Sequence, residues 1–314
     1  MKKVTILVPC YNEEDSLPLF YKALTHIMEQ YAGLYAWEIL FVNDGSKDHT
    51  LDIIRDLRKS DKRVSYVSLS RNFGKEKAML AGFDYATGDA IIIMDADLQD
   101  PPSLIGEMLE KWEEGYDDIY AKRISRGEES WLRRKLSLTF YKILQKSTDF
   151  DILENVGDFR LLDRQCLQTL KKLRESERYT KGLFCYIGYN KCCIEFNRKD
   201  RVAGKSHWNF WKLFGLAIDG LVSFTTAPLR FASIMGFIVS FIAFVLMFVY
   251  FIKAIIWGDP VSGFPTLIVA IFFIGGVQLI CLGVIGEYIS RIFIESKHRT
   301  VYIPQEYNGE RVLL

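Results

Sequence analysis

Two aspartates separated by one residue, Asp95 and Asp97, are the clearest candidates for chemistry in this chain of 314 residues. They come at the end of an apolar run at residues 90–94, and Gln99 follows two positions later. Carboxylate and amide oxygens at the end of a strand suit Mg²⁺ or Mn²⁺, which bind one or two carboxylates and bridge them to substrate phosphates. An isolated Asp-x-Asp pair is usually solvated surface, so its interpretation depends on its neighbours.

Polar residues follow three other apolar runs in the same way. VPCYNEE continues the run at residues 4–8, VNDGS continues the run at 39–42, and SRNFGK follows the run at 64–69. The carboxyl ends of parallel strands meet at one edge of a sheet, where loops form ligand sites. A metal-bound diphosphate beside Asp44 and Glu13 would complete a nucleotide pocket there.

Strands and helices must alternate to bring these residues together. Strands are predicted at residues 4–8, 39–42, 64–69, 90–94, 119–121 and 159–162, and helices at residues 15–31, 48–59, 75–86 and 103–114. Strands alternating with helices of about a dozen residues form βαβ units. The predicted fold is therefore α/β, with a doubly wound and mostly parallel sheet.

Other chemistries are disfavoured by motifs that the sequence lacks. No G-x-G-x-x-G fingerprint occurs, and Gly204-Lys205-Ser206 does not complete a P-loop because Lys199 stands where glycine is needed. The histidines show no zinc spacing and the cysteines no C-x-x-C pair, so free thiols are expected. With 40 Lys+Arg against 39 Asp+Glu, the net charge of +1 does not favour a nucleic-acid partner.

Two long runs without a charged residue, at 231–252 and 261–286, dominate the C-terminal part of the chain. Each is long enough to cross a bilayer, which takes roughly 20 apolar residues. The alternative, a buried hairpin in a soluble core, is less favoured because core helices normally carry a polar stripe. We predict two transmembrane helices at about 231–254 and 261–286.

The distribution of basic residues predicts the orientation of this hairpin. Arg230 precedes the first run, whereas Arg291, Lys297 and Arg299 follow the second, and the connecting loop offers only Lys253. This bias places both termini in the cytoplasm, in a multi-pass protein of the inner or plasma membrane. The apolar run at residues 4–8 is too short for a secretory signal.

The predicted organisation has four parts. A cytoplasmic catalytic domain covers residues 1–205, an amphipathic juxtamembrane region 206–229, the two spans 230–287, and a cytoplasmic tail 288–314. Residues 210–222 are predicted to form an interfacial helix. Lys and Arg are in excess over Asp and Glu in residues 122–135 and 191–212, with aromatic residues nearby, which favours anionic lipid headgroups.

The motifs together resemble a known family. VPCYNEE, VNDGSKDHT, SRNFGKEKAMLAGF and MDADLQDPP are similar to the inverting glycosyltransferases of the GT-A fold, family 2. Within that family they resemble the polyprenyl-phosphate glycosyltransferases, which include bactoprenol glucosyltransferases and dolichyl-phosphate mannose synthase. The motifs fill residues 4–102 densely and continue at 157–161, 178–182 and 198–206.

The resemblance implies a role for each matching residue. Pro9, Tyr11 and Glu13 would line the nucleotide base and ribose, and Asp44 would accept a hydrogen bond from the base. Asp95 would lie by the ribose and diphosphate, while Asp97 and Gln99 would hold Mg²⁺ or Mn²⁺. Asp158 matches the position of a proposed base, and Arg201 and Lys205 would contact phosphate groups. The non-functional alternatives are that Asp158 lies in an exposed turn and that Arg201 and Lys205 lie in a solvated basic loop.

The expected reaction moves a hexose from a nucleoside diphosphate sugar to undecaprenyl or another polyprenyl phosphate at the cytoplasmic face. UDP-glucose is the first expectation, with UDP-N-acetylglucosamine and UDP-galactose left open. A processive polysaccharide synthase would carry Gln-x-x-Arg-Trp after the acidic motifs, and this pentad is absent. A non-catalytic accessory subunit is disfavoured by the intact Asp95, Asp97 and Asp158. Self-association is expected on family grounds.

Overall fold

The computed structural model describes residues 1–124, 145, 148, 151, 153, 156–197, 222, 225–257 and 263–313. The chain forms two compact units, one made of Met1–Ala217 and Thr300–Leu314 and the other of Ile218–Arg299. The first unit therefore contains residues from both sides of the second in the sequence.

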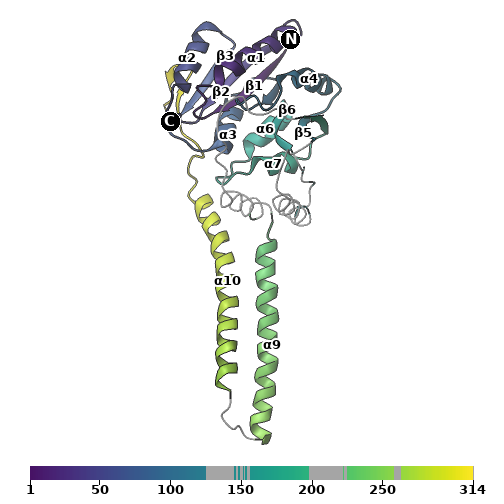
Figure 1. The fold of residues 1–314 in the computed structure, drawn as a ribbon, viewed down its shortest axis with the longest axis vertical. Coiled ribbons are helices and arrows are strands. Elements are labelled where there is room, and N and C mark those ends of the chain that lie inside the picture. The colour runs from purple at the N-terminus through teal and green to yellow at the C-terminus, as the bar shows by residue number, and fades with distance from the viewer. Residues whose placement is uncertain are drawn as a thin grey trace. The chain divides into compact units, whose positions relative to one another are not determined.

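The described part of the first unit is built on a nine-stranded sheet in the order β7-β5-β6-β4-β1-β2-β3-β8-β9. Figure 1 labels β1, β2, β3, β5 and β6 of this sheet. Its strands are β1 Lys2–Cys10, β2 Tyr35–Asn43, β3 Val64–Leu69, β4 Ala90–Ile93, β5 Asp118–Arg123, β6 Val156–Asp163, β7 Lys191–Phe196, β8 Pro304–Tyr307 and β9 Glu310–Arg311. Every strand predicted from the sequence is present, and only the one predicted at 90–94 extends beyond its observed strand, by the single residue Met94.

The sheet is parallel at its centre and mixed at its sides. β4, β1, β2 and β3 are parallel neighbours, as predicted. β6 lies between β4 and β5 and runs antiparallel to both, and β8 runs antiparallel to β3. The α/β fold is confirmed, while the sheet as a whole is mixed rather than mostly parallel. Because β6 is antiparallel to β4, its first residues lie at the edge where β4 ends.

Helices cover both faces of the sheet. They are α1 Leu17–Gln30, α2 Thr50–Ser60, α3 Lys75–Tyr85, α4 Ile105–Glu113, α6 Arg164–Lys172 and α7 Thr180–Tyr186, with the short 3₁₀ helix η1 Pro102–Leu104 before α4. The helices α1, α2 and α4 share one core with Ile6 of β1. The next residue, Leu7, points to the opposite face. There it packs against Gly82 of α3 so closely that a Cβ would lie 2.1 Å from its side chain.

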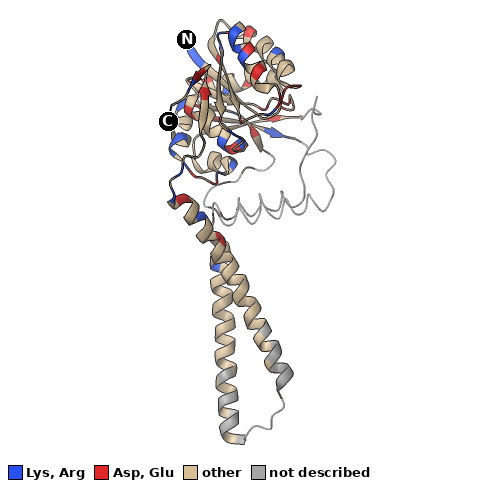
Figure 2. Cartoon of the chain, turned by 90° about the vertical axis from the view of Figure 1, so that its left-hand side faces the viewer, with Lys and Arg blue, Asp and Glu red and all other residues tan. Residues whose placement is uncertain are grey.

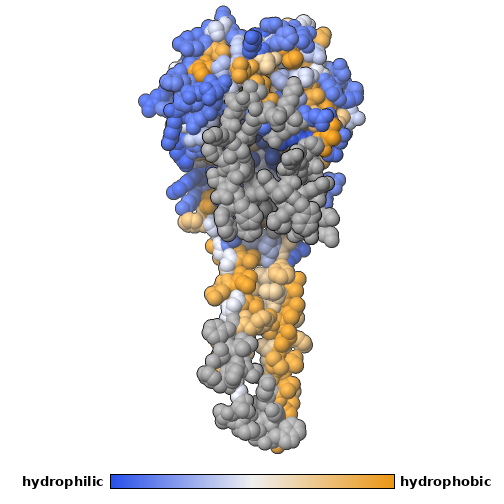
Figure 3. Space-filling model, in the orientation of Figure 1, coloured by the Kyte–Doolittle hydropathy of each residue, from blue (hydrophilic) through white to orange (hydrophobic). Residues whose placement is uncertain are grey.

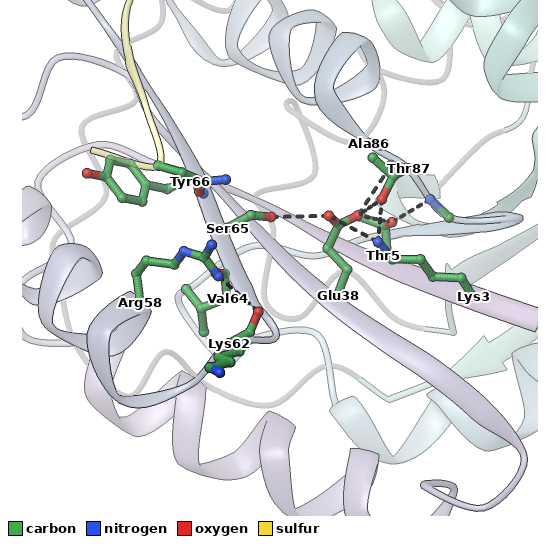
Figure 4. Close-up of polar contacts among 12 residues, drawn as sticks. Lys3, Thr5, Glu38, Arg58, Lys62, Val64, Ser65, Tyr66, Ala86 and Thr87 are labelled. Carbon is green, nitrogen blue, oxygen red and sulfur yellow. Dashed lines mark hydrogen bonds and ion pairs between the residues drawn. The ribbon is translucent and has the colours of Figure 1, made fainter. Parts of the chain in front are cut away.

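A buried carboxylate links the starts of three strands (Figure 4). Glu38 of β2 accepts hydrogen bonds from the hydroxyls of Thr5 at 2.6 Å, Thr87 at 2.8 Å and Ser65 at 3.3 Å. The Lys3 Nζ lies 3.4 Å from the same carboxylate. Burial by itself raises the pKa of Glu38, but these hydrogen bonds and the Lys3 ammonium outweigh it and hold the pKa below its ordinary value.

The C-terminal residues complete the sheet, which the sequence did not predict. Glu306 of β8 pairs with Arg55 of α2 at 2.5 Å and accepts from the hydroxyl of Tyr66 on β3. The Asn308 side chain accepts from the Tyr66 backbone N–H at 2.8 Å. Residues 300–313 are thus part of the first unit rather than a separate tail.

The second unit contains the two long apolar helices. α9 Ala227–Trp257 and α10 Phe264–Ser296 include windows, Ala227–Leu246 and Phe273–Ser296, that are long and apolar enough to cross a membrane. Their described side chains are mainly apolar and exposed, and Lys, Arg, Asp and Glu are concentrated in the first unit (Figures 2 and 3). The Tyr288 hydroxyl of α10 donates to the Thr225 carbonyl at 2.7 Å, which ties α10 to the segment just before α9.

Several predicted features lie outside the described residues. These are Arg201, Lys205, most of the two basic segments, and the predicted interfacial helix at 210–222 apart from residue 222.

Glu38→Ala should destabilise the first unit, because the buried Thr5 hydroxyl loses its acceptor. A buried group left without its partner typically costs about 1–3 kcal/mol. We expect a lower unfolding temperature for the detergent-solubilised variant than for the exposed-site control Glu29→Ala. Equal unfolding temperatures for the two variants would contradict this account.

The same carboxylate predicts a pH dependence. Its folded-state pKa is lowered, so its contribution to stability is fully present above the unfolded value of about 4.3 and is lost as the pH falls through the folded pKa. The difference in unfolding temperature between wild type and Glu38→Gln should therefore stay constant from pH 7 to about 5 and shrink as the pH falls below about 4.3. A difference that grows in acid would show that the sign is wrong.

Candidate active site

Backbone hydrogen bonds fasten the loops after β1 and β2 to each other. The Asn12 N–H donates to the Ser46 hydroxyl at 3.0 Å, and the Lys47 N–H donates to the Asn12 side chain at 2.9 Å. The Glu13 N–H donates to the hydroxyl of Thr50 at the start of α2, at 2.8 Å. This arrangement holds the loop of Pro9, Tyr11 and Glu13 at the carboxyl edge of the sheet, and Tyr11 is 42% exposed there.

Asp44 joins this edge to the loop between β3 and α3. Its carboxylate is almost fully buried and accepts from the backbone N–H groups of Phe73 at 2.7 Å and Gly74 at 2.9 Å. Burial raises the pKa of Asp44, although both backbone hydrogen bonds act in the opposite direction. Gly45 has a φ of 64°, and a Cβ there would lie 2.4 Å from the Arg71 backbone, so glycine is required at this close approach.

Lys75, the first residue of α3, connects two carboxylates from different parts of the sheet. Its Nζ lies 2.7 Å from Oδ1 and 2.8 Å from Oδ2 of Asp95, which follows β4, and 2.6 Å from Oδ2 of Asp158 on β6. Burial lowers the pKa of Lys75, but the two carboxylates outweigh it and hold the pKa above its ordinary value. The sequence prediction did not include Lys75.

Asp158 presents one oxygen to Lys75 and leaves the other open. Its side chain is 10% exposed, and Oδ1 has no hydrogen-bond partner among the described residues. Burial raises the pKa of Asp158, but the Lys75 and Lys181 ammonium groups outweigh burial and hold the pKa well below its usual range. Asp158 is therefore a nearly buried anion whose Oδ1 can accept a further hydrogen bond as far as the described residues show.

The turn after β4 carries the predicted metal ligands. Asp97 Oδ1 accepts from the Gln99 N–H at 3.1 Å, and Leu98 between them has a φ of 57°, which is uncommon for a residue other than glycine. Gln99 Oε1 is buried without a hydrogen-bond partner among the residues that the structure describes. Burial and the nearby Asp95 raise the pKa of Asp100 to about 6, and the Arg123 guanidinium lies 3.7 Å from its carboxylate.

The oxygens of Asp97 and Gln99 are of the chemical type that binds a divalent cation, but they do not form a complete coordination shell. Within the described ranges, no three His, Cys, Asp or Glu side chains converge on one point. The orphaned Gln99 oxygen and the Asp97 carboxylate are hard donors of the kind that Mg²⁺ and Mn²⁺ take. Such ions commonly draw their remaining ligands from water and substrate phosphates.

A buried ion pair supports the strand that carries Asp158. Arg160 of β6 is 1% exposed, pairs with Asp118 of β5 at 3.0 Å and stacks its guanidinium 3.8 Å from the Phe184 ring centre. Glu76 of α3 accepts from the Thr180 N–H of α7 at 2.9 Å. These contacts fix β6, α3 and α7 around the Asp158 carboxylate.

The described site residues predicted from the sequence lie on the carboxyl-edge loops, apart from Pro9 near the end of β1 and Asp158 near the start of β6. They are Pro9, Tyr11, Glu13, Asp44, Asp95, Asp97, Gln99 and Asp158. Their individual roles stay predictions, as do those of Arg201 and Lys205. The sequence prediction missed Lys75, Asp100, Arg160 and Lys181. Lys75 could have been found, since it follows Gly74 directly in the SRNFGK segment after the third strand.

A cavity of about 720 Å³ lies at the opposite edge of the sheet and is not part of this site. Its lining includes Lys2, Trp112, Glu113 and Asp163. Lys2 pairs with Glu113 at 2.7 Å, and the Trp112 indole donates to Asp163 at 2.9 Å.

Comparison with known proteins identifies similar chains. A bactoprenol glucosyl transferase of Shigella phage SfV is 46% identical over 301 residues, which are 96% of this chain and 97% of the relative. A prophage bactoprenol glucosyl transferase homolog of Escherichia coli K12 is 44% identical over 301 residues, 96% and 98% of the two chains. The solved mannosyltransferase PcManGT from Pyrobaculum calidifontis, in complex with GDP-Man and Mn²⁺, has a TM-score of 0.44 at 16% identity, covering 95% of this chain and 76% of that one.

Two family models also match. One, GtrB C-terminal hairpin, matches residues 227–292, which include α9 and most of α10. The other, Glycosyl transferase family 2, matches residues 5–171, which include the Asp44 and Lys75 loops, the acidic turn after β4 and Asp158. Because this match covers more than half of the chain and the relatives align along nearly all of it, the chain belongs to glycosyl transferase family 2.

Proposed function

We propose that this glycosyltransferase moves glucose from UDP-glucose to a polyprenyl phosphate carrier and inverts the anomeric centre. The similarity to bactoprenol glucosyl transferases over nearly the whole chain carries the proposal, because it includes both the sheet unit and the apolar hairpin. A family 2 domain followed by two apolar helices suits a soluble donor and a lipid acceptor.

The donor would occupy the loops at the carboxyl edge. Pro9, Tyr11 and Glu13 would line the base and ribose beside Asp44, and Asp95 would lie by the ribose and diphosphate. Asp44 supports this pocket in a second way, since its carboxylate holds the Phe73 and Gly74 backbone in place. The backbone bonds between the first two loops keep the pocket wall in shape before the donor arrives.

Asp97 and Gln99 would hold Mg²⁺ or Mn²⁺. When bound, the ion neutralises negative charge that develops on the departing diphosphate. Arg201 and Lys205 would contact phosphate groups and contribute to the same stabilisation. Preorganised charges of this kind often lower the activation barrier more than any other single effect in an active site.

The acceptor phosphate would attack the anomeric carbon directly. A phosphate oxygen forms the new bond to that carbon, the bond to the nucleoside diphosphate breaks, and the leaving group takes the electron pair. The second pKa of a phosphate monoester is near 6, so the acceptor is mostly dianionic at neutral pH. A strong base is therefore not required, and the Asp158 carboxylate would orient substrate groups that carry a proton, such as sugar hydroxyls, more than it removes one.

The lipid acceptor requires a membrane location. α9 and α10 would cross the inner or plasma membrane, with both termini and the sheet unit in the cytoplasm. Residues 210–222 would form the interfacial helix, and the basic segments at 122–135 and 191–212 would meet anionic headgroups. Self-association belongs to the same proposal on family grounds.

Purified protein given undecaprenyl phosphate and a panel of radiolabelled nucleotide sugars should move label into the lipid phase with UDP-glucose. UDP-N-acetylglucosamine and UDP-galactose distinguish the alternative donors, and omission of the lipid phosphate is the control. Transfer from another sugar alone would change the donor and keep the reaction class. Failure with every nucleotide sugar would reject the proposal.

Asp97→Ala should lower transfer by at least about 10²-fold, the scale of losing one preorganised stabiliser of transition-state charge. EDTA should abolish wild-type transfer, and added Mg²⁺ or Mn²⁺ should restore it. Asp56→Ala, an exposed carboxylate on α2, is the matched control and should behave as wild type. Transfer that persists unchanged in EDTA would remove the metal from the proposal.

A further inference from the structure

Lys75 has no part in the function argued so far, yet it makes the closest ionic contacts of the site. Its ammonium lies 2.6 Å from Asp158 and 2.7 Å from Asp95, so one side chain connects the carboxylate proposed for substrate orientation with the one proposed for the donor. The backbone just before Lys75 is held in place, because the Asp44 carboxylate accepts hydrogen bonds from the N–H groups of Phe73 and Gly74.

The contact with Asp158 is asymmetric. Lys75 holds Oδ2, whereas Oδ1 is buried and has no hydrogen-bond partner in the described part of the chain. A carboxylate fixed by one oxygen cannot rotate freely, so the other oxygen keeps a defined direction. An open buried acceptor is costly unless a ligand meets it, which suggests that Oδ1 contacts the substrate.

The charges around Asp158 show why an ammonium is needed there. Glu76 of α3 and Asp95 add negative charge near Lys75, while Lys181 of α7 and Arg160 of β6 add positive charge. Arg160 is already committed to Asp118 at 3.0 Å. Among the described residues, Lys75 is the cation within bonding distance of Asp158, and without it a nearly buried carboxylate would face two anionic substrates.

We propose that Lys75 is a positioning residue for sugar transfer, which holds the Asp158 carboxylate ionised and aims its Oδ1 at a hydrogen-bond donor of the bound substrates, a sugar hydroxyl or the proton of a monoanionic acceptor phosphate. This inference rests on the proposed function. Lys75 acts through Asp158, so removing either residue should remove the same contribution.

A double-mutant cycle tests this dependence. Lys75→Met and Asp158→Asn should each lower kcat by about 10²-fold, the typical cost of a misplaced reacting group. The double variant Lys75→Met/Asp158→Asn should be no more than about threefold worse than Asp158→Asn alone, because residues that act as a unit are not additive. Lys77→Met on the same helix is the matched control and should keep wild-type kcat.

The variant Lys75→Arg distinguishes the contribution of the positive charge at position 75 from that of the lysine side chain's shape, because arginine keeps the charge. It should recover at least about tenfold of the activity lost in Lys75→Met. The ratio of kcat for Lys75→Met to kcat for Lys77→Met should fall as the pH drops from 7 to 5, since the carboxylate loses its stabilising cation and becomes protonated at a higher pH. Titration of the acceptor phosphate affects kcat of both variants equally, so it does not change the ratio of the two kcat values.

The outcomes separate the two hypotheses. If the wild type transfers sugar and Lys75→Met is as active as Lys77→Met, the role of Lys75 is rejected and the proposed function stands. The same holds if the activity losses of the two single variants multiply in the double variant. If Lys75→Met does not fold, the comparison of the double variant with Asp158→Asn still decides, because the double variant no longer contains the Asp158 charge. Absence of transfer by the wild type with every donor rejects the proposed function itself.

Discussion

Negative charge concentrated at one edge of a sheet is the constraint on which the rest of the site depends. Asp44, Asp95, Asp97, Asp100 and Asp158 all follow or begin strands at this edge, and several of them are buried. Carboxylates cannot remain ionised and buried without compensation. The fold must therefore supply a partner for each one from another segment of the chain.

The groups that compensate each carboxylate differ, and these differences indicate a separate role for each carboxylate. Asp44 is compensated by two backbone N–H groups, so it organises a loop. Asp158 is compensated by an ammonium on one oxygen, and within the described ranges its other oxygen has no hydrogen-bond partner, so it stays an anion with an open acceptor. Asp100 has little compensation, with a guanidinium at 3.7 Å, and its pKa rises to about 6. Asp95, Asp97 and Asp100 gather negative charge at the turn after β4, and a divalent cation would be most favourable there.

Sequence periodicity was enough to predict the central sheet and the loops that carry most of the candidate site. Alternating strands and helices force the residues after β1, β2 and β4 to one edge, whatever the side-chain details. The partners of those residues could not be predicted in the same way. Lys75 meets Asp158 only because β6 inserts antiparallel between β4 and β5, and no local pattern specifies that insertion. Asp118 and Arg160 likewise find each other across two strands whose pairing is non-local.

The C-terminal strand shows the same limit and adds a topological consequence. Glu306 contacts Arg55 and Tyr66, which lie far away in the sequence, so nothing near residue 306 reveals the strand. Residues before and after the apolar hairpin are thus hydrogen-bonded into one sheet. Segments of one sheet occupy one compartment, so a hairpin inserted between them can cross a membrane only an even number of times. This requirement follows from β3–β8 pairing and is independent of the distribution of Lys and Arg, and the two crossings proposed for α9 and α10 satisfy it.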